Sequence, residues 1–200
     1  MSERSGSGSD ECDDTERLIA ANTRPWNSFW AWRDKPIAEQ GAAREIMLSA
    51  GLKVESLVSR QNLDPPDCEA VVDGLWTGIE VTELVHRKML ERSLKAVKER
   101  AAGAEPNRPE AYFVWGKDDL ISILQAQVDL KDAANLKGGP YERYILIIHT
   151  DEFFLDSESV ERFLVGSSFR TSMITDAILG LSYEPRLGRC PTFRLTIGTK

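Results

Sequence analysis

Two carboxylates flank a short, strongly marked hairpin in this chain of 200 residues. Two runs of strand-forming residues, 68–72 and 75–85, lie on either side of Asp73-Gly74, a dipeptide typical of a two-residue turn between antiparallel strands. If the pairing continues outward from this turn, Asp67 stands opposite Glu80. Directly opposed residues have Cβ atoms roughly 4.5–5.5 Å apart, so two like charges there repel each other. A divalent cation would relieve the repulsion, because Mg²⁺ prefers one or two carboxylates together with water and substrate phosphates.

A purely structural interpretation of the same two residues stays open at this point. Asp67 follows Pro65-Pro66 and could be an ordinary turn residue, and Glu80 could be an exposed strand residue. The metal-site hypothesis also depends on a two-residue loop, since a three-residue loop would change the register.

A second polar feature lies on a predicted helix, residues 118–136. Gln127 and Lys131 fall one turn apart in the middle of its apolar face, where a lysine is costly unless it is paired. We expect a polar contact with the hairpin site, and the alternative is a lysine whose stem lies along the apolar surface with its charge in water. The apolar face comprises Leu120, Ile121, Ile123, Leu124, Val128 and Leu130, and the opposite side Asp119, Ser122, Gln125, Asp129 and Asp132.

The elements that must position these residues alternate between helix and strand, which predicts an α/β fold. Helices are predicted at 36–50, 86–102, 118–136 and 158–164, and strands at 53–59, 68–72, 75–85, 112–115, 144–150, 177–183 and 192–197. Residues 1–22 are acidic and rich in Ser and Gly, which predicts a disordered tail, and residues 23–200 form a single predicted domain. Four aromatic residues near its start are interpreted as core residues or as a base-stacking surface: Trp26, Phe29, Trp30 and Trp32.

Composition narrows the class of protein. The net charge of −7 is not typical of a protein that coats nucleic acid unaided, although local patches and a bound metal can reverse the field. The helix beginning at His86 is rich in Lys and Arg and could follow a phosphate backbone or form a solvated face.

The sequence has no apolar run long enough to span a membrane and no secretory signal, so we expect a soluble cytoplasmic protein. Its three cysteines are isolated from one another, so we expect reduced thiols and no zinc site. His149 is interpreted as a strand-end residue, and no serine-hydrolase, P-loop or dinucleotide-binding motif is present.

The carboxylates and the element order together resemble the PD-(D/E)XK nuclease superfamily. The matching residues are Pro66-Asp67 followed by Glu80-Val81-Thr82, within a succession of helix, three strands, helix and strand over residues 37–150. The resemblance implies a restriction-endonuclease-like αβββαβ core, with a mixed central sheet flanked by helices and with extra C-terminal strands. It differs from the family at Thr82, where the motif has a lysine.

The resemblance also implies roles for individual residues. Asp67 and Glu80 would be ligands of Mg²⁺ or Mn²⁺, with the Val81 carbonyl as a further ligand. Some members take the missing lysine, or a glutamine, from the following core helix, where Lys131 and Gln127 lie. A glutamate of the first helix often completes the site, and both Glu39 and Glu45 are candidates that periodicity does not separate.

The implied function is divalent-metal-dependent hydrolysis of phosphodiester bonds by an endonuclease acting on nucleic acid, DNA rather than RNA. The alternative is a catalytically inactive fold of the same type that serves as a protein or nucleic-acid interaction module. No membrane partner is expected, and the oligomeric state is open.

Overall fold

The computed structural model describes residues 34–61, 63, 65–86, 114–133, 135–152 and 155–199, which lie almost entirely in one compact unit spanning Pro36–Lys200. The predicted tail, the aromatic cluster and all but the first residue of the charged helix predicted from His86 fall outside these residues. The elements follow in the order α2 (Lys35–Ser49), β1 (Val54–Ser59), β2 (Cys68–Val72), β3 (Leu75–Glu83), α4 (Lys117–Asp132), β4 (Arg143–Thr150), α5 (Ser157–Leu164), β5 (Phe169–Thr171), β6 (Asp176–Leu181), β7 (Thr192–Leu195) and β8 (Ile197–Thr199).

The chain is an α/β protein with a mixed central sheet of six strands in the order β1-β2-β3-β4-β6-β7. The strands β1, β2 and β3 pair antiparallel, β4 is parallel to both β3 and β6, and β7 closes the far edge antiparallel to β6. A small second sheet joins β5 to β8. The predicted fold class is therefore confirmed at this level.

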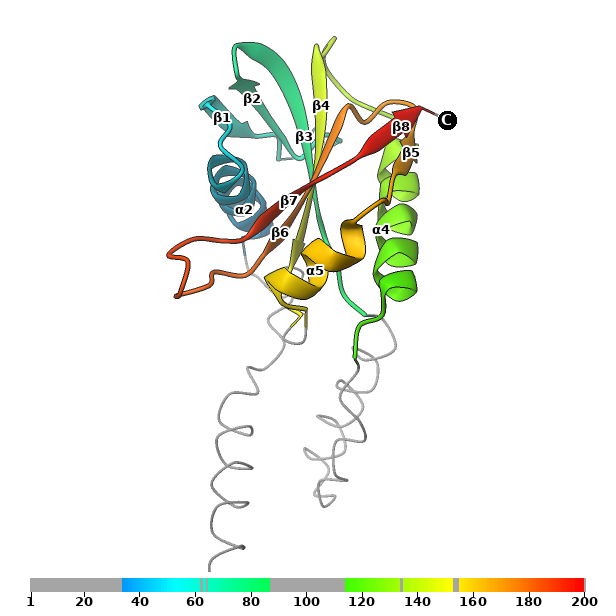
Figure 1. Cartoon of the computed structure of the whole chain (residues 1–200). Coiled ribbons are helices and arrows are strands. Elements are labelled where there is room, and N and C mark those ends of the chain that lie inside the picture. Colours follow the sequence, from blue (N-terminus) through cyan, green and yellow to red (C-terminus); the bar gives the residue numbers. More distant parts are fainter. Residues whose placement is uncertain are drawn as a thin grey trace, which may run out of the picture. The chain divides into compact units, whose positions relative to one another are not determined.

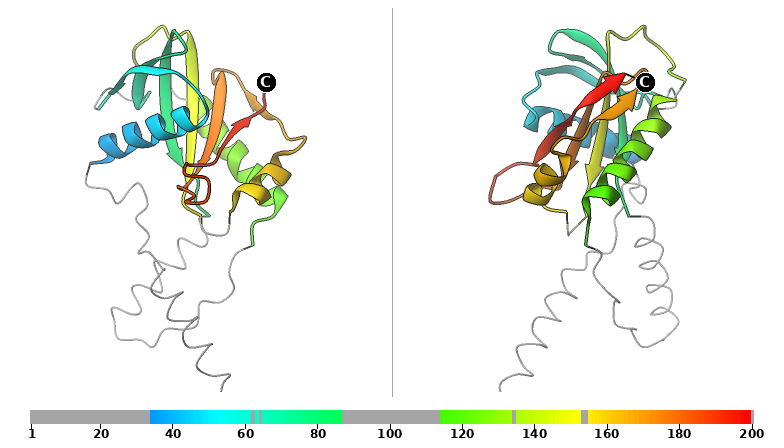
Figure 2. Two further views of the ribbon diagram at one scale, coloured as in Figure 1. Left: turned by 60° about the vertical axis from the view of Figure 1, so that its left-hand side comes forward. Right: turned by 45° about the vertical axis from the view of Figure 1, so that its right-hand side comes forward.

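Helices cover both faces of the sheet, with α2 on one side and α4 and α5 on the other (Figures 1 and 2). Side chains alternate between the faces of a strand, and one buried cluster joins Tyr144, Leu146 and Ile148 of β4 to the apolar side of α4. On the opposite face, the position of a Cβ atom on Gly180 would lie 2.5 Å from Ile46 of α2. The central strands are therefore buried from both sides, which explains the continuous apolar run of β4.

Local signals account for the elements nearest the site. The helix α2 ends where Gly51 adopts a positive φ of 79° and the Leu52 N–H donates to the Met47 carbonyl, as in a Schellman motif. The β2–β3 turn has positive φ at both Asp73 (51°) and Gly74 (85°), which is the geometry of the two-residue type I′ turn.

Three expectations about secondary structure were wrong. Val114 and Trp115, the described half of the predicted strand 112–115, are irregular and lead into α4. The helix α4 stops at Asp132 rather than near residue 136, and the carboxyl-terminal strand is divided into β7 and β8. The strand β5 was not predicted at all, because three residues are too short to show alternation and its partner β8 lies far along the chain.

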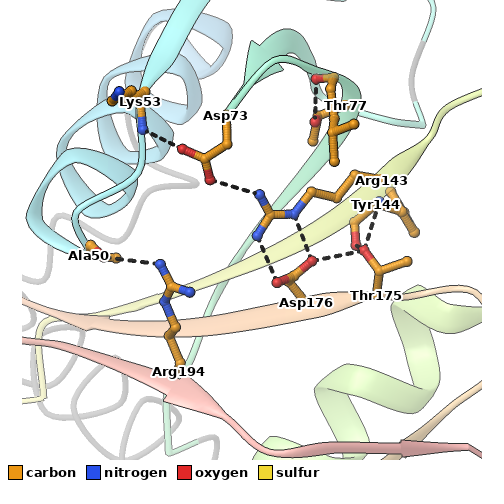
Figure 3. Close-up of polar contacts among 10 residues, drawn as sticks. Ala50, Lys53, Asp73, Thr77, Arg143, Tyr144, Thr175, Asp176 and Arg194 are labelled. Atoms are coloured by element: carbon orange, nitrogen blue, oxygen red, sulfur yellow. Dashed lines mark hydrogen bonds and ion pairs between the residues drawn. The ribbon is translucent and has the colours of Figure 1, made fainter.

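Arg143, the first residue of β4, is hydrogen-bonded to β6 and to the hairpin turn (Figure 3). The Arg143 guanidinium donates two hydrogen bonds of 2.7 Å to Asp176 of β6 and a third of 3.2 Å to Asp73 in the hairpin turn. Asp73 also accepts from the Lys53 N–H at 2.9 Å. The hairpin, β1 and the parallel strands are thus held in one arrangement by charge-assisted hydrogen bonds.

No helix in the described part of the chain is long and apolar enough to cross a membrane.

Candidate functional site

The hairpin register is the one that the turn predicted. Val72 pairs with Leu75 and Cys68 with Ile79, so Asp67 and Glu80 are the next residues outward on the two chain segments. Asp67 lies just before β2 and accepts a hydrogen bond of 2.8 Å from the Val81 N–H through Oδ2. The charge of Asp67 acts on Glu80, so the two carboxylates lie near each other at the end of the hairpin.

Both carboxylates are buried, and the burial of Glu80 excludes its interpretation as an exposed strand residue, whereas Asp67 lies in the bend that precedes β2. Asp67 is 8% exposed and Glu80 is 4% exposed. Burial raises the pKa of Glu80 above its usual range, and the charge of Asp67 raises it further. Lys131 opposes this shift, which makes the balance of charge around Glu80 the central electrostatic feature of the site.

The helix α4 supplies the positive charge. The Lys131 Nζ forms an ion pair with Glu80 Oε1, and the side chains of the two residues are 23% and 5% exposed. Gln127, one turn earlier, accepts a hydrogen bond of 3.1 Å from the Thr82 hydroxyl. The predicted polar contact between α4 and the hairpin thus exists, and Thr82 is bound to the same helix that carries the lysine.

The predicted faces of α4 need two corrections. Leu130 is 67% exposed, although it was expected on the apolar face, and Asp132 is 4% exposed, although it was expected on the solvated side. The buried stripe runs every four residues from Leu120 through Leu124 and Val128 to Asp132. The Asp132 carboxylate accepts from the backbone N–H groups of residues 172–174 at 2.7–3.1 Å, which satisfies a charge at the end of an apolar stripe.

The structure distinguishes between the two glutamates of the first helix. Glu39 is 7% exposed, and its charge contributes to the raised pKa of Glu80. It also contributes to the raised pKa of Cys68, which reaches about 12 chiefly through burial and then through Asp67. Glu45 is exposed, and its charge instead acts on the thiol of Cys190. Glu39, not Glu45, therefore joins the electrostatic neighbourhood of the carboxylate pair.

The Val81 carbonyl has a suitable direction to complete a ligand set. In a β-strand the N–H and C=O of one residue point to the same side. Because the Val81 N–H donates to Asp67, its carbonyl also faces the Asp67 side of β3. No group of three or more His, Cys, Asp or Glu side chains in the described ranges is arranged to hold a metal ion, so a cation here would rely on two carboxylates, a carbonyl and water.

One atom of the pair fits such a cation. The second oxygen of Glu80, Oε2, is buried and has no hydrogen-bond partner among the described residues. A buried carboxylate oxygen without a partner is costly, and a cation with its bound water would satisfy it. The donor set also consists only of oxygens, which suits Mg²⁺ or Mn²⁺.

Sequence reasoning missed Tyr144, a buried residue on the same face of the sheet as Glu80. The apolar run of β4 gives no sign of which residues face α4, because both faces are buried.

His149 is the penultimate residue of β4, in keeping with its interpretation as a strand-end residue. Burial lowers its pKa, and its Nε2 lies 3.4 Å from Asp151 Oδ1.

Comparisons with known proteins assign no family, because no protein-family model, curated protein or solved structure matches this chain.

Proposed function

We propose that this protein is a divalent-metal-dependent nuclease of the PD-(D/E)XK type, built on a restriction-endonuclease-like αβββαβ core, that hydrolyses phosphodiester bonds in DNA. The element order α2-β1-β2-β3-α4-β4 supports the proposed core, with β6 and β7 as C-terminal additions to the sheet. The observation that carries the proposal is the contact of Lys131 with Glu80, beside the buried Asp67.

Each residue of the proposed site would have its own role in the reaction. Asp67, Glu80 and the Val81 carbonyl would hold Mg²⁺ or Mn²⁺, and the ion would supply an activated water and stabilise charge on the phosphoryl group. Lys131 would add positive charge near the attacking water and the phosphate, where preorganised charge is most effective. Gln127 would orient Thr82 and the neighbouring strand through its hydrogen bond.

A specific observation favours a second candidate, an inactive fold of this type that serves as an interaction module. Thr82 stands where the motif has lysine, and Lys131 is engaged in an ion pair with Glu80. In this alternative, Lys131 is a structural counter-ion that neutralises a buried carboxylate, and no cation is needed.

Cleavage assays with neutralised ligands distinguish the two candidates. Purified wild type, Asp67→Asn and Glu80→Gln are incubated with single-stranded DNA, duplex DNA and RNA in Mg²⁺ and then in Mn²⁺, with EDTA controls. Glu161→Gln is the matched control, because Glu161 is an exposed glutamate on α5. We expect cleavage by wild type and Glu161→Gln, and none with EDTA or either ligand variant.

Other outcomes would reject the nuclease. Cleavage that persists in both ligand variants comes from another site or from a contaminant. A folded wild type that cuts none of the substrates under any of these conditions favours the interaction module.

A further inference from the structure

The hydroxyl of Tyr144 is a second buried polar group close to the carboxylate pair. Tyr144 is 3% exposed, and its Oη has no hydrogen-bond partner among the described residues. Buried tyrosine hydroxyls usually find a partner, because an unpartnered one loses its hydrogen bonds to water without replacement. A ligand beside this hydroxyl would supply the missing hydrogen-bond partner.

The register places the tyrosine on the face of the sheet that carries the site. Tyr144 of β4 lies beside Gly78 of β3, and alternation along β3 directs Gly78 and Glu80 to the same face. Tyr144 also packs in the buried cluster that includes Val128 of α4, so its ring lies between the sheet and the helix that carries Lys131.

The charges around Tyr144 keep its hydroxyl protonated. Burial raises the pKa of Tyr144 most, and the charges of Glu80, Asp67 and Asp132 raise it further. Asp132 already accepts hydrogen bonds from the backbone of residues 172–174. The phenol is thus a neutral donor with two carboxylates of the candidate site nearby.

We propose that Tyr144 is a positioning residue of the carboxylate site, whose hydroxyl donates a hydrogen bond to a water molecule carried by a divalent cation at Asp67 and Glu80. This inference rests on the proposed metal-dependent function. A single hydrated cation would satisfy both buried atoms, because Glu80 Oε2 would bind the ion and Tyr144 would bind its water. A neutral phenol suits this task, since it donates a hydrogen bond without repelling the cation. Ions that retain inner-sphere water, Mg²⁺ and Mn²⁺, would therefore be preferred.

The test removes only the hydroxyl. Wild type, Tyr144→Phe and Tyr183→Phe are titrated with Mn²⁺, with free Mn²⁺ measured by electron paramagnetic resonance and with melting temperatures recorded with and without the ion. Tyr183 is the matched control, because its side chain is 59% exposed. We expect Tyr144→Phe to bind Mn²⁺ about tenfold more weakly, the equivalent of about one charge-assisted hydrogen bond. Without metal, Tyr144→Phe should melt at the same or a higher temperature than wild type, and Tyr183→Phe should match wild type in both measurements.

The outcomes separate this inference from the proposed function. Equal Mn²⁺ affinity in wild type and Tyr144→Phe, with binding lost in Glu80→Gln, overturns the role of Tyr144 and leaves the metal site intact. A lower melting temperature of metal-free Tyr144→Phe also overturns it, because the hydroxyl would then have a structural partner. A wild type that binds no Mn²⁺ removes the metal site, and this inference with it.

Discussion

Replacing Lys131 by methionine tests the electrostatics of the site most directly. The change keeps an unbranched stem on α4 and removes the charge that faces Glu80. Removing one partner of a buried ion pair costs about 3–5 kcal/mol, because the other charge stays buried alone. Lys131 retains 23% of its side-chain exposure, so we expect the low end, about 3 kcal/mol. For a domain of this size, that loss lowers the melting temperature by roughly 6–12 °C.

A divalent cation should reverse part of this loss. If Mn²⁺ binds at Glu80, it replaces the missing positive charge, so millimolar Mn²⁺ should raise the melting temperature of Lys131→Met more than that of wild type. If Lys131 is only a structural counter-ion, both proteins should show the same response to Mn²⁺. If Lys131 acts on the substrate, Lys131→Met should cleave nothing in Mg²⁺ or in Mn²⁺.

A double-mutant cycle decides whether the reasoning about the pair is correct. Urea unfolding of wild type, Lys131→Met, Glu80→Gln and the double variant measures the coupling between the two residues. We expect a coupling of at least about 1 kcal/mol, since the double variant leaves no unpaired buried charge. A coupling below about 0.5 kcal/mol, the usual limit of additivity, would refute the idea that Lys131 neutralises Glu80.

Two further predictions concern the scaffold. Gly180→Ala should destabilise the protein by about 1–3 kcal/mol in urea unfolding, because its Cβ would lie 2.5 Å from Ile46. The control Gly41→Ala, at an open position of α2, should stabilise the protein by about 0.5–1 kcal/mol. Equal effects of the two substitutions would contradict the packing of α2 on β6. The hydrogen bonds from Arg143 lower the pKa of Asp176 below the usual value of an aspartate, so the stability from this pair is present above about pH 4 and is lost as the pH falls through the lowered pKa. Asp176→Asn should therefore lose less stability than wild type between pH 4 and pH 2.5 in the same measurement, and parallel pH profiles would contradict this assignment.

The hairpin shows what local sequence can specify. Asp73-Gly74 determines the turn, the turn determines the register, and the register places Asp67 and Glu80 at adjacent positions, as the structure confirms. The helix α4 was found from its period, but the exact buried stripe was not. An acid such as Asp132 can continue a stripe when backbone N–H groups from a distant turn receive it, and those groups cannot be located from the helix sequence.

The choice between Glu39 and Glu45 could not be made from periodicity, because Glu45 also has apolar residues at helical spacing, Ala42 and Leu48. Glu39 shares an i, i+4, i+7 spacing with Ala43 and Ile46, and all three are buried on α2. A glutamate on such a stripe is directed toward the sheet, and in the structure its charge acts on Glu80. Glu45 lies outside this stripe and is exposed. Tyr144 could not be assigned from the sequence either, because its face depends on the parallel pairing of β3 with β4, two strands that are remote in sequence.

If the proposed nuclease assignment holds, Thr82 in place of the motif lysine means that the positive charge is carried by the helix α4 instead of the strand β3. A lysine two residues after Glu80 on β3 would approach the carboxylate along its own strand, whereas Lys131 approaches it from the last turn of α4. Thr82 then serves a different purpose, since its hydroxyl donates to Gln127 and links β3 to the helix one turn before the lysine. A positive charge at the carboxyl end of a helix is also favoured by the helix dipole. In the proposed nuclease, the chemistry requires a positive charge beside Glu80, whether a strand or a helix supplies it. This is why the paired measurements on Lys131 and Glu80 are more informative about activity than the missing motif residue alone.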